Sequence, residues 1–172
     1  PVSPYGVSEL AAEHLCVLYW KNFQVPTVSL RYFTVYGPRQ RPDMAFHKFI
    51  RAMLTDKELP LYGTGAQTRD FTFVKDAVAA NLLAAEKGEP GGVYNIGGGS
   101  RVSVNHVFEV LEKIIGKPAK IKRHPVQQGD VTHTVASTAR AERDLGYKPS
   151  VTLEEGLRAE VEYIKELLAE GM

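Results

Sequence analysis

The sequence predicts an α/β fold, because segments rich in β-branched and aromatic residues alternate with segments whose apolar residues recur at helical spacing. The strand-like segments are short and few, which is typical of part of a sheet rather than a whole one. The length of 172 residues is that of one globular domain. We therefore expect an α/β chain with a partial sheet.

The first predicted element is a helix over residues 5–22. Ser3 can accept a hydrogen bond from the free backbone N–H groups of a helix start, and Pro4 suits the first helical position. The segment 27–33 follows and is predicted to be a buried strand. Residues at helical spacing give the helix an apolar face, namely Leu10, Leu15, Leu18 and Tyr19.

The middle of the chain shows a second helical pattern and several short strand-like segments. Pro60 suggests an edge strand, since proline cannot donate to a sheet. Asp76 is expected to cap a helix that ends at Gly88. The predicted elements are a helix over 45–54, an edge strand over 59–62, a polar loop over 63–70 and a strand over 71–74.

The last third predicts three more helices. Ser103 begins a helix that has a strong apolar face and ends at Gly116. Ser137 is expected to cap a second, short helix. Thr152 and Glu155 have capping-box spacing and begin the last helix, which runs to about residue 169. Short strands are predicted over 93–96 and 119–123. A flexible turn is sufficient to explain the glycines at 97–99, which do not form a phosphate-binding loop.

Composition excludes several classes of function. Twenty-one Lys and Arg residues against twenty Asp and Glu leave a net charge of +1, which argues against nucleic-acid binding. The apolar runs are far shorter than the ~20 residues that span a bilayer, so no membrane partner is expected. The lone Cys16 cannot form an internal disulfide, which favours a reduced, cytoplasmic setting. The histidines lack metal-ligand spacing, so no metal site is predicted.

Tyr5 and Glu9 are four residues apart on the first predicted helix, so their side chains share a face. In a dehydrogenase-like site, a lysine at the second position activates the tyrosine as a general base and holds the cofactor ribose. A carboxylate there favours the protonated phenol and repels anions. On this pair alone, an ordinary tyrosine near a helix start is the better interpretation.

Longer motifs change that interpretation. They are PYGVS at 4–8, RYFTVYGPRQRPDMA at 31–45, GTGAQTRDF at 63–71, NIG at 95–97 and GDV at 129–131. With these motifs the chain resembles the extended short-chain dehydrogenase/reductase family, and within it the NAD-dependent nucleotide-sugar epimerases and dehydratases. The stretch RYFTVYGPRQRPDMAF is most similar to UDP-glucuronate 4-epimerases, with UDP-glucose 4-epimerases next. The resemblance covers essentially the whole chain and corresponds to the C-terminal half of such an extended Rossmann-type enzyme.

The resemblance implies that Tyr5 is the catalytic tyrosine, which exchanges the proton of the sugar C4 hydroxyl as hydride passes to NAD and also contacts the cofactor. Glu9 stands where the family has its lysine. The glycine-rich NAD-binding turn, the ribose-binding acid and the catalytic Ser or Thr of the family all precede the tyrosine. We therefore expect NAD in the complete enzyme and no NAD binding by this chain.

The resemblance also implies a UDP-sugar site. Arg69 corresponds to an arginine on the UDP diphosphate, where a planar fork suits phosphate oxygens. Arg41 corresponds to an arginine that faces the sugar carboxylate. Thr34 lies against the nucleotide sugar and is the residue of the glucuronate type, and Asp130 lies near the uridine ribose. The ordinary alternatives are an arginine paired with Asp70, an exposed arginine and a threonine at a strand end.

This comparison divides the chain into two parts. Residues 1–40 are expected to be a remnant of the dinucleotide-binding domain, and residues 41–172 a UDP-sugar-binding lobe with the C-terminal helices. A chain that opens at Pro1 and runs at once into a helix is expected to be a fragment. The apolar face of that helix then predicts a homo-oligomer, or association with a complementary N-terminal half.

Three functions follow as hypotheses. The first is a truncated NAD-dependent UDP-sugar 4-epimerase that oxidises and reduces C4 in its complete form and is inactive alone. The second is a non-catalytic UDP-sugar-binding or dimerisation module, because Glu9 replaces the activating lysine. The third is a fragment of a nucleotide-sugar 4,6-dehydratase, which would need acidic residues from outside this chain.

Overall fold

The computed structural model describes residues 1, 3–99, 101–125 and 133–171 and confirms the α/β fold class. Its strands pair two at a time, in three parallel pairs and one antiparallel pair. No helix in the described part of the chain combines the length and apolar character needed to cross a bilayer. The helices are α1 (Pro4–Phe23), α2 (Ala45–Leu54), α3 (Val74–Lys87), α4 (Val104–Ile115), α5 (Ala139–Leu145) and α6 (Leu153–Ala169).

The strands bring together segments that are far apart in the chain. Parallel pairs join β1 to β6, β2 to β5 and β3 to β8, and an antiparallel pair joins β4 to β7. In the first pair Leu30 lies opposite Tyr94. The bounds are β1 (Ser29–Tyr32), β2 (Val35–Tyr36), β3 (Leu59–Tyr62), β4 (Thr68–Asp70), β5 (Thr72–Phe73), β6 (Val93–Ile96), β7 (Arg101–Ser103) and β8 (Ile121–His124).

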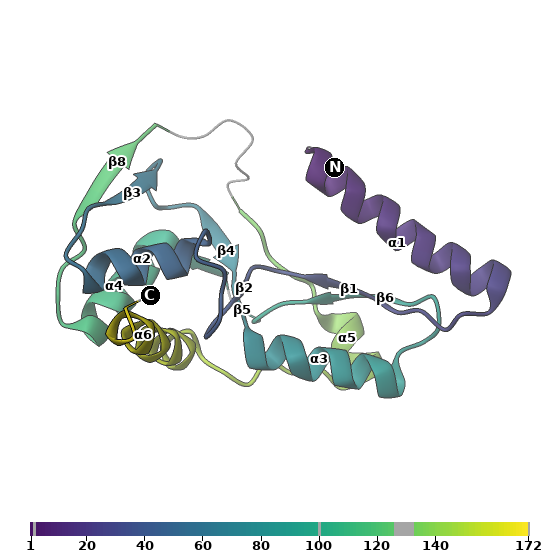
Figure 1. Ribbon diagram of the computed structural model, residues 1–172. Helices are drawn as coiled ribbons and strands as arrows, with labels where there is room; N and C mark the ends of the chain where they lie inside the picture. Colours follow the sequence, from purple (N-terminus) through teal and green to yellow (C-terminus); the bar gives the residue numbers. More distant parts are fainter. Residues whose placement is uncertain (2, 100, 126–132, 172) are drawn as a thin grey trace.

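Two apolar cores divide the structure. Figure 1 shows α2, α4 and α6 gathered beside β3 and β8, while α3 and α5 lie with β1 and β6. The first group encloses a core that includes Ile50, Leu111 and Leu157. The second encloses a smaller core around Tyr94 and Ile96. Each core is formed by side chains from distant parts of the sequence. Packing against these cores stabilises the short strands.

Helix α1 lies apart from both cores (Figure 1). The predicted helix and its Ser3 cap are confirmed, but none of its residues is buried, so its predicted apolar face covers no core within this chain. The helix is tied to β1 by Glu13, whose carboxylate lies 2.5 and 2.7 Å from the Arg31 guanidinium. That hydrogen-bonded guanidinium holds the pKa of Glu13 below its usual value.

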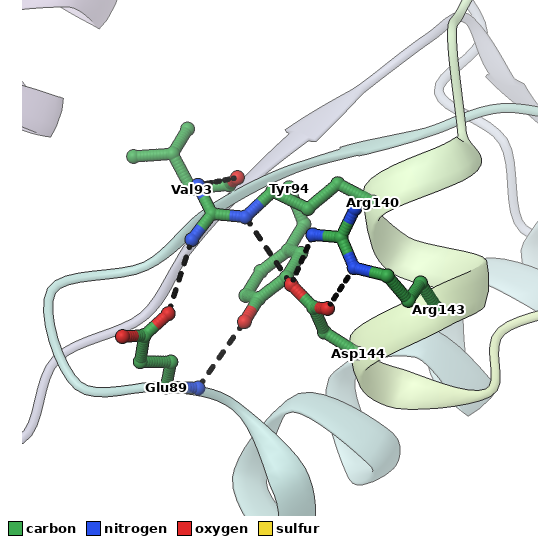
Figure 2. A network of polar contacts seen from close by, with 6 residues as sticks. All are labelled: Glu89, Val93, Tyr94, Arg140, Arg143 and Asp144. Atoms are coloured by element: carbon green, nitrogen blue, oxygen red, sulfur yellow. Dashed lines mark hydrogen bonds and ion pairs between the residues drawn. The ribbon is translucent and has the colours of Figure 1, made fainter.

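The polar network at the end of α5 joins this helix to β6 (Figure 2). The Arg140 guanidinium lies 3.3 Å from both the Glu89 and Asp144 carboxylates and 4.9 Å from the centre of the Tyr94 ring. The Tyr94 hydroxyl accepts the Glu89 N–H at 3.2 Å. Because the ion pairs are exposed, each contributes less than about 1 kcal/mol, and the network only supplements the buried core.

Asp70 holds the junction between the two cores. Its fully buried carboxylate accepts hydrogen bonds from the backbone N–H groups of Gly98 (2.7 Å) and Ala136 (3.1 Å). A Cβ atom on Gly97 would lie 2.7 Å from an Asp70 carboxylate oxygen, and one on Gly98 would lie 2.0 Å from the Phe71 carbonyl oxygen. These glycines are therefore required for close packing, and turn flexibility alone does not explain them.

Three further predictions about local structure are wrong. Residues 68–70 form β4 rather than loop, because they pair with a strand more than thirty residues away, and local sequence carries no signal for that pairing. Asp76 lies in the first turn of α3 but does not cap it. Its buried carboxylate instead accepts hydrogen bonds from the Ser150 hydroxyl (2.8 Å) and backbone (3.1 Å). Similarly, α5 begins after Thr138 and not at the predicted Ser137 cap.

We predict that Asp70→Ala lowers the free energy of unfolding by about 2–3 kcal/mol, because it leaves two backbone N–H groups without their acceptor. Urea unfolding followed by circular dichroism measures the change. Asp43→Ala, which removes an exposed carboxylate, is the control and should change stability by less than about 0.5 kcal/mol. Equal stabilities for the two variants would contradict the role assigned to Asp70.

Candidate functional site

A cleft with a volume of about 790 Å³ is lined by residues of α2 and β3. Helix α2 supplies Lys48 and Arg51, which lie three residues apart on one face. Strand β3 supplies the opposite side with Leu59–Tyr62, in which Leu59 and Leu61 are buried and the residues between and after them are exposed. The cleft lining thus combines cationic side chains with aliphatic and aromatic groups.

Two of the predicted substrate-binding residues, Thr34 and Arg69, line this cleft. Thr34 lies between β1 and β2, where its carbonyl oxygen accepts the Thr72 N–H at 3.0 Å. Arg69 lies on β4, and its guanidinium donates to the Thr68 carbonyl oxygen at 3.0 Å. Thr72 lies three residues after Arg69, so its hydrogen bond to Thr34 links the two chain segments that bring these residues to the cleft.

Arg41 lies at the edge of the cleft. Its exposed guanidinium is 3.3 Å from the carboxylate of Asp43, which lines the cleft. Asp130, the fourth predicted substrate-binding residue, lies outside the described residues. The structure therefore places three of the four predicted substrate-binding side chains in or beside one cleft.

Tyr5 and Glu9 lie elsewhere, on α1 (Figure 1). The Tyr5 side chain is 72% exposed, and Glu9 is exposed one turn further along the helix. Neither residue lines the cleft that holds Thr34 and Arg69. The predicted catalytic residue is therefore not brought together with Thr34 and Arg69, the predicted substrate-binding residues that line the described cleft.

The groups around Tyr5 do not fit a dinucleotide. The next turn of α1 offers the Glu9 carboxylate, which repels phosphate, and the Ser8 hydroxyl is already donated to the Tyr5 carbonyl oxygen at 2.7 Å. The lysine that the family resemblance predicts at this position would donate to the cofactor ribose, and the Glu9 carboxylate has no such donor. For metals, no group of three His, Cys, Asp or Glu side chains suited to an ion occurs among the described residues.

Several cleft residues were missed by sequence reasoning. Tyr62 is 40% exposed, and its ring centre lies 5.3 Å from that of His124 at an interplanar angle of 33°. Gln67 donates to the Tyr62 carbonyl oxygen at 3.0 Å and so ties the following loop to β3. The alternation of Leu59, Pro60, Leu61 and Tyr62 carried a usable signal, because a period of two places Tyr62 on the face away from the core.

The charge of the cleft differs from that of the chain. Among the residues that the structure describes, its lining contains four cationic side chains, namely Lys48, Arg51, Lys57 and Arg69, and the two carboxylates of Asp43 and Glu58. This excess of two positive charges is concentrated in a concave surface, whereas the whole chain has a net charge of only +1. The cleft is therefore suited to an anionic ligand that also has a flat, partly apolar group.

Glu160 on α6 fixes the start of the loop that carries Arg41. Its fully buried carboxyl group accepts the Gly37 N–H at 3.0 Å, immediately after β2. Burial raises the pKa of Glu160 to about 8, against the opposing effect of the Gly37 hydrogen bond. The same carboxyl group raises the pKa of the buried Tyr36, in addition to the larger effect of burial.

Comparison with known families agrees with this geometry. The sequence model of the NAD dependent epimerase/dehydratase family matches residues 1–97. The chain belongs to this family. The resemblance predicted from the motifs is thereby confirmed at the family level.

Solved epimerase structures match this family member closely. A UDP-glucuronic acid 4-epimerase from Bacillus cereus, in complex with UDP-glucuronic acid and NAD, is 50% identical with a TM-score of 0.93 and is matched over 97% of this chain and 54% of its own. A UDP-glucose 4-epimerase from Thermotoga maritima, with UDP-glucose, is 37% identical with a TM-score of 0.93, over 98% of this chain and 55% of its own.

A sequence relative gives the same picture. The UDP-glucuronate 4-epimerase of Thermodesulfobacterium geofontis is 37% identical over 167 residues, which are 96% of this chain and 51% of the relative. The chain thus spans about half the length of the epimerases it matches. The matched epimerases belong to the same family, and each of them is covered by this chain over only about half of its length.

We predict that Glu160 makes the stability of this chain fall as pH rises from about 5 to 8. The unfolded chain releases the Glu160 proton near the ordinary pKa of 4.5, whereas the folded chain keeps it up to about 8. Across that interval the free energy of unfolding loses up to ~1.4 kcal/mol per pH unit, and it is insensitive to this group at higher pH.

Urea unfolding of the wild type and Glu160→Gln at pH 5 and pH 8 tests this. The free energy of unfolding of the variant, measured relative to that of the wild type, should be higher at pH 8 than at pH 5. The wild type loses stability over this interval, whereas the amide of the variant has no proton to lose. Glu166→Gln, an exposed position on the same helix, is the control and should follow the wild type. If Glu160→Gln also follows the wild type, the buried carboxyl does not cause the pH dependence.

Proposed function

We propose that this chain is the UDP-sugar-binding half of an NAD-dependent UDP-sugar 4-epimerase, and that the complete enzyme acts on UDP-glucuronate. The observation that carries the proposal is the meeting of Thr34 and Arg69 in one cationic cleft of about 790 Å³. That volume lies within the ~300–1,000 Å³ range of small-molecule sites. The names of the matched epimerases support a nucleotide sugar as the ligand.

The lining of the cleft offers groups for the diphosphate and for the base of UDP. The Arg69 guanidinium can bind diphosphate oxygens through two parallel hydrogen bonds, and Lys48 and Arg51 add positive charge from the facing helix. The exposed ring of Tyr62 offers a flat surface for a pyrimidine base. In this proposal Asp130 contacts the ribose.

The sugar is proposed to lie toward Thr34 and the loop that carries Arg41. Thr34 can hydrogen-bond sugar hydroxyls from its place in the cleft. Arg41 is already 3.3 Å from a carboxylate, that of Asp43, so its guanidinium can exchange this partner for the carboxylate of a bound glucuronate. Exchange of one exposed ion pair for another costs little, because exposed pairs contribute less than ~1 kcal/mol.

The chain alone is proposed to bind the substrate without converting it. Epimerisation at C4 requires NAD in the complete enzyme, and we propose that Tyr5 is the acid/base residue there. In this chain Tyr5 is 72% exposed and is followed one turn later by Glu9 instead of a cation. These residues do not fit NAD, so binding of the nucleotide sugar is the contribution of this chain.

A second candidate function is a non-catalytic UDP-sugar-binding or dimerisation module. Glu9 favours it, because a carboxylate cannot replace the activating lysine. The surface of α1 favours it too, since large apolar residues remain exposed there: Leu15, Leu18, Tyr19 and Phe23. We propose that these residues are covered by protein, either a second copy of this chain or a complementary N-terminal half.

We predict that Arg69→Ala weakens UDP binding about 10- to 100-fold, which corresponds to ~1.5–3 kcal/mol for lost hydrogen bonds to a charged group. Isothermal titration calorimetry with UDP measures this affinity. Arg158→Ala removes an exposed arginine on α6 and should bind UDP like the wild type. Unchanged binding in Arg69→Ala would exclude the proposed diphosphate contact.

The choice between the two functions is tested at Glu9. We predict that Glu9→Lys, mixed with the N-terminal half of the Bacillus cereus enzyme, NAD and UDP-glucuronate, gives turnover at least tenfold above the wild-type mixture. Glu86→Lys, at an exposed position on α3, is the control. Sedimentation velocity on the same samples shows whether the two halves associate. Association without turnover would favour the binding or dimerisation module.

A further inference from the structure

The loop from Gly37 to Asp43 is held by the side chain of Gln40. The Gln40 amide nitrogen donates to the Val35 carbonyl oxygen at 3.0 Å, and its amide oxygen accepts the His47 backbone N–H at 3.1 Å. Val35 belongs to β2 and His47 to the first turn of α2. One partly buried amide therefore bridges the strand before the loop and the helix after it.

The loop backbone has a shape that needs such support. Gln40 donates its N–H to the Gly37 carbonyl oxygen at 3.0 Å, which closes a tight turn. Within this turn Arg39 has a φ of 69°, in the left-handed region that costs a non-glycine residue roughly 1 kcal/mol or more. Glu160 holds the beginning of the turn through the Gly37 N–H, so the turn is fixed at both ends.

Arg41 follows Gln40 directly and depends on this backbone for its position. The contacts of its side chain are with exposed groups, the Asp43 carboxylate at 3.3 Å and the Met44 sulfur at 3.6 Å. With a side chain 75% exposed, Arg41 gains little positional restraint from packing. The two hydrogen bonds of Gln40 instead fix the point from which the guanidinium extends.

We propose that Gln40 is a positioning residue that sets the preference of this site for a carboxylated sugar nucleotide, by holding the backbone that carries Arg41. The inference rests on the proposed function, in which Arg41 faces the sugar carboxylate. A neutral amide is suited to this place because it donates to one backbone group and accepts from another at the same time. Methionine, which is similar in size, supplies neither of these hydrogen bonds.

The test compares Kd values for UDP, UDP-glucose and UDP-glucuronate, measured by calorimetry for the wild type and Gln40→Met. We expect the wild type to prefer UDP-glucuronate over UDP-glucose about tenfold. Gln40→Met should reduce that preference to less than threefold while changing the Kd for UDP less than twofold. Gln24→Met, which removes an exposed amide at the end of α1, is the control and should keep the preference.

A double variant separates positioning from general damage. If Gln40 acts through Arg41, Gln40→Met should reduce the preference no further once Arg41→Ala has removed it. Gln40→Glu keeps the acceptor for His47 but loses the donor to Val35, so it should give an intermediate loss. It also serves as the test variant if Gln40→Met does not fold.

The outcomes distinguish this inference from the proposed function. A wild type that fails to bind UDP overturns the proposed function, and the inference with it. A wild type that binds UDP without preferring UDP-glucuronate overturns the inference and the proposed choice of UDP-glucuronate as substrate, but leaves the proposed binding of a UDP-sugar standing. The inference is also wrong if Gln40→Met keeps the preference, or if it weakens the binding of all three ligands equally.

Discussion

The buried carboxylate of Asp70 is the contact on which the arrangement of this chain depends. It accepts backbone N–H groups from the segments after β6 and before α5, and Asp70 itself is the last residue of β4. The next residue, Phe71, belongs to the larger core, and Ile96, two residues before Gly98, belongs to the smaller one, so Asp70 lies at a junction of segments that enter both cores. Because alternate residues of a strand face opposite sides, the burial of Asp70 turns Arg69 toward the cleft. One buried acceptor thus links the fold to the proposed binding of phosphate.

The rest of the site follows from elements anchored around that junction. Helix α2 packs Ile50 into the larger core and presents Lys48 and Arg51 to the cleft. The loop before α2 is fixed by Glu160 and Gln40, so that Arg41 extends from a backbone of defined shape. Helix α1, which carries Tyr5, takes no part in either core. The chain thus has a formed cleft but leaves the surface of α1 exposed, and it spans about half the length of each matched epimerase.

Local signals predicted much of the fold. The bounds of α2 were predicted residue for residue, and the caps at Ser3, Ser103 and Thr152 were confirmed, because capping depends on residues within one turn. Sequence reasoning missed the pairing of β4 with β7 and the acceptor role of Asp76, since both depend on partners far along the chain. In the site, family motifs predicted Thr34 and Arg69, which the fold places in one cleft, whereas the bridging role of Gln40 depends on tertiary contacts, and Tyr62 was missed although the alternation of β3 pointed to its exposure. The boundary between a dinucleotide-domain remnant over 1–40 and a UDP-sugar-binding lobe over 41–172 stays a prediction.

We propose that this chain has a formed site for a uridine nucleotide and none for the dinucleotide. Thermal unfolding of the purified chain with millimolar UDP, and separately with millimolar NAD, measures both, because a ligand of the folded state raises the unfolding midpoint. A ligand at 100 times its Kd adds about 2.7 kcal/mol of stability. We predict a clear rise with UDP and no change with NAD. No rise with UDP, or a rise with NAD, would contradict this account.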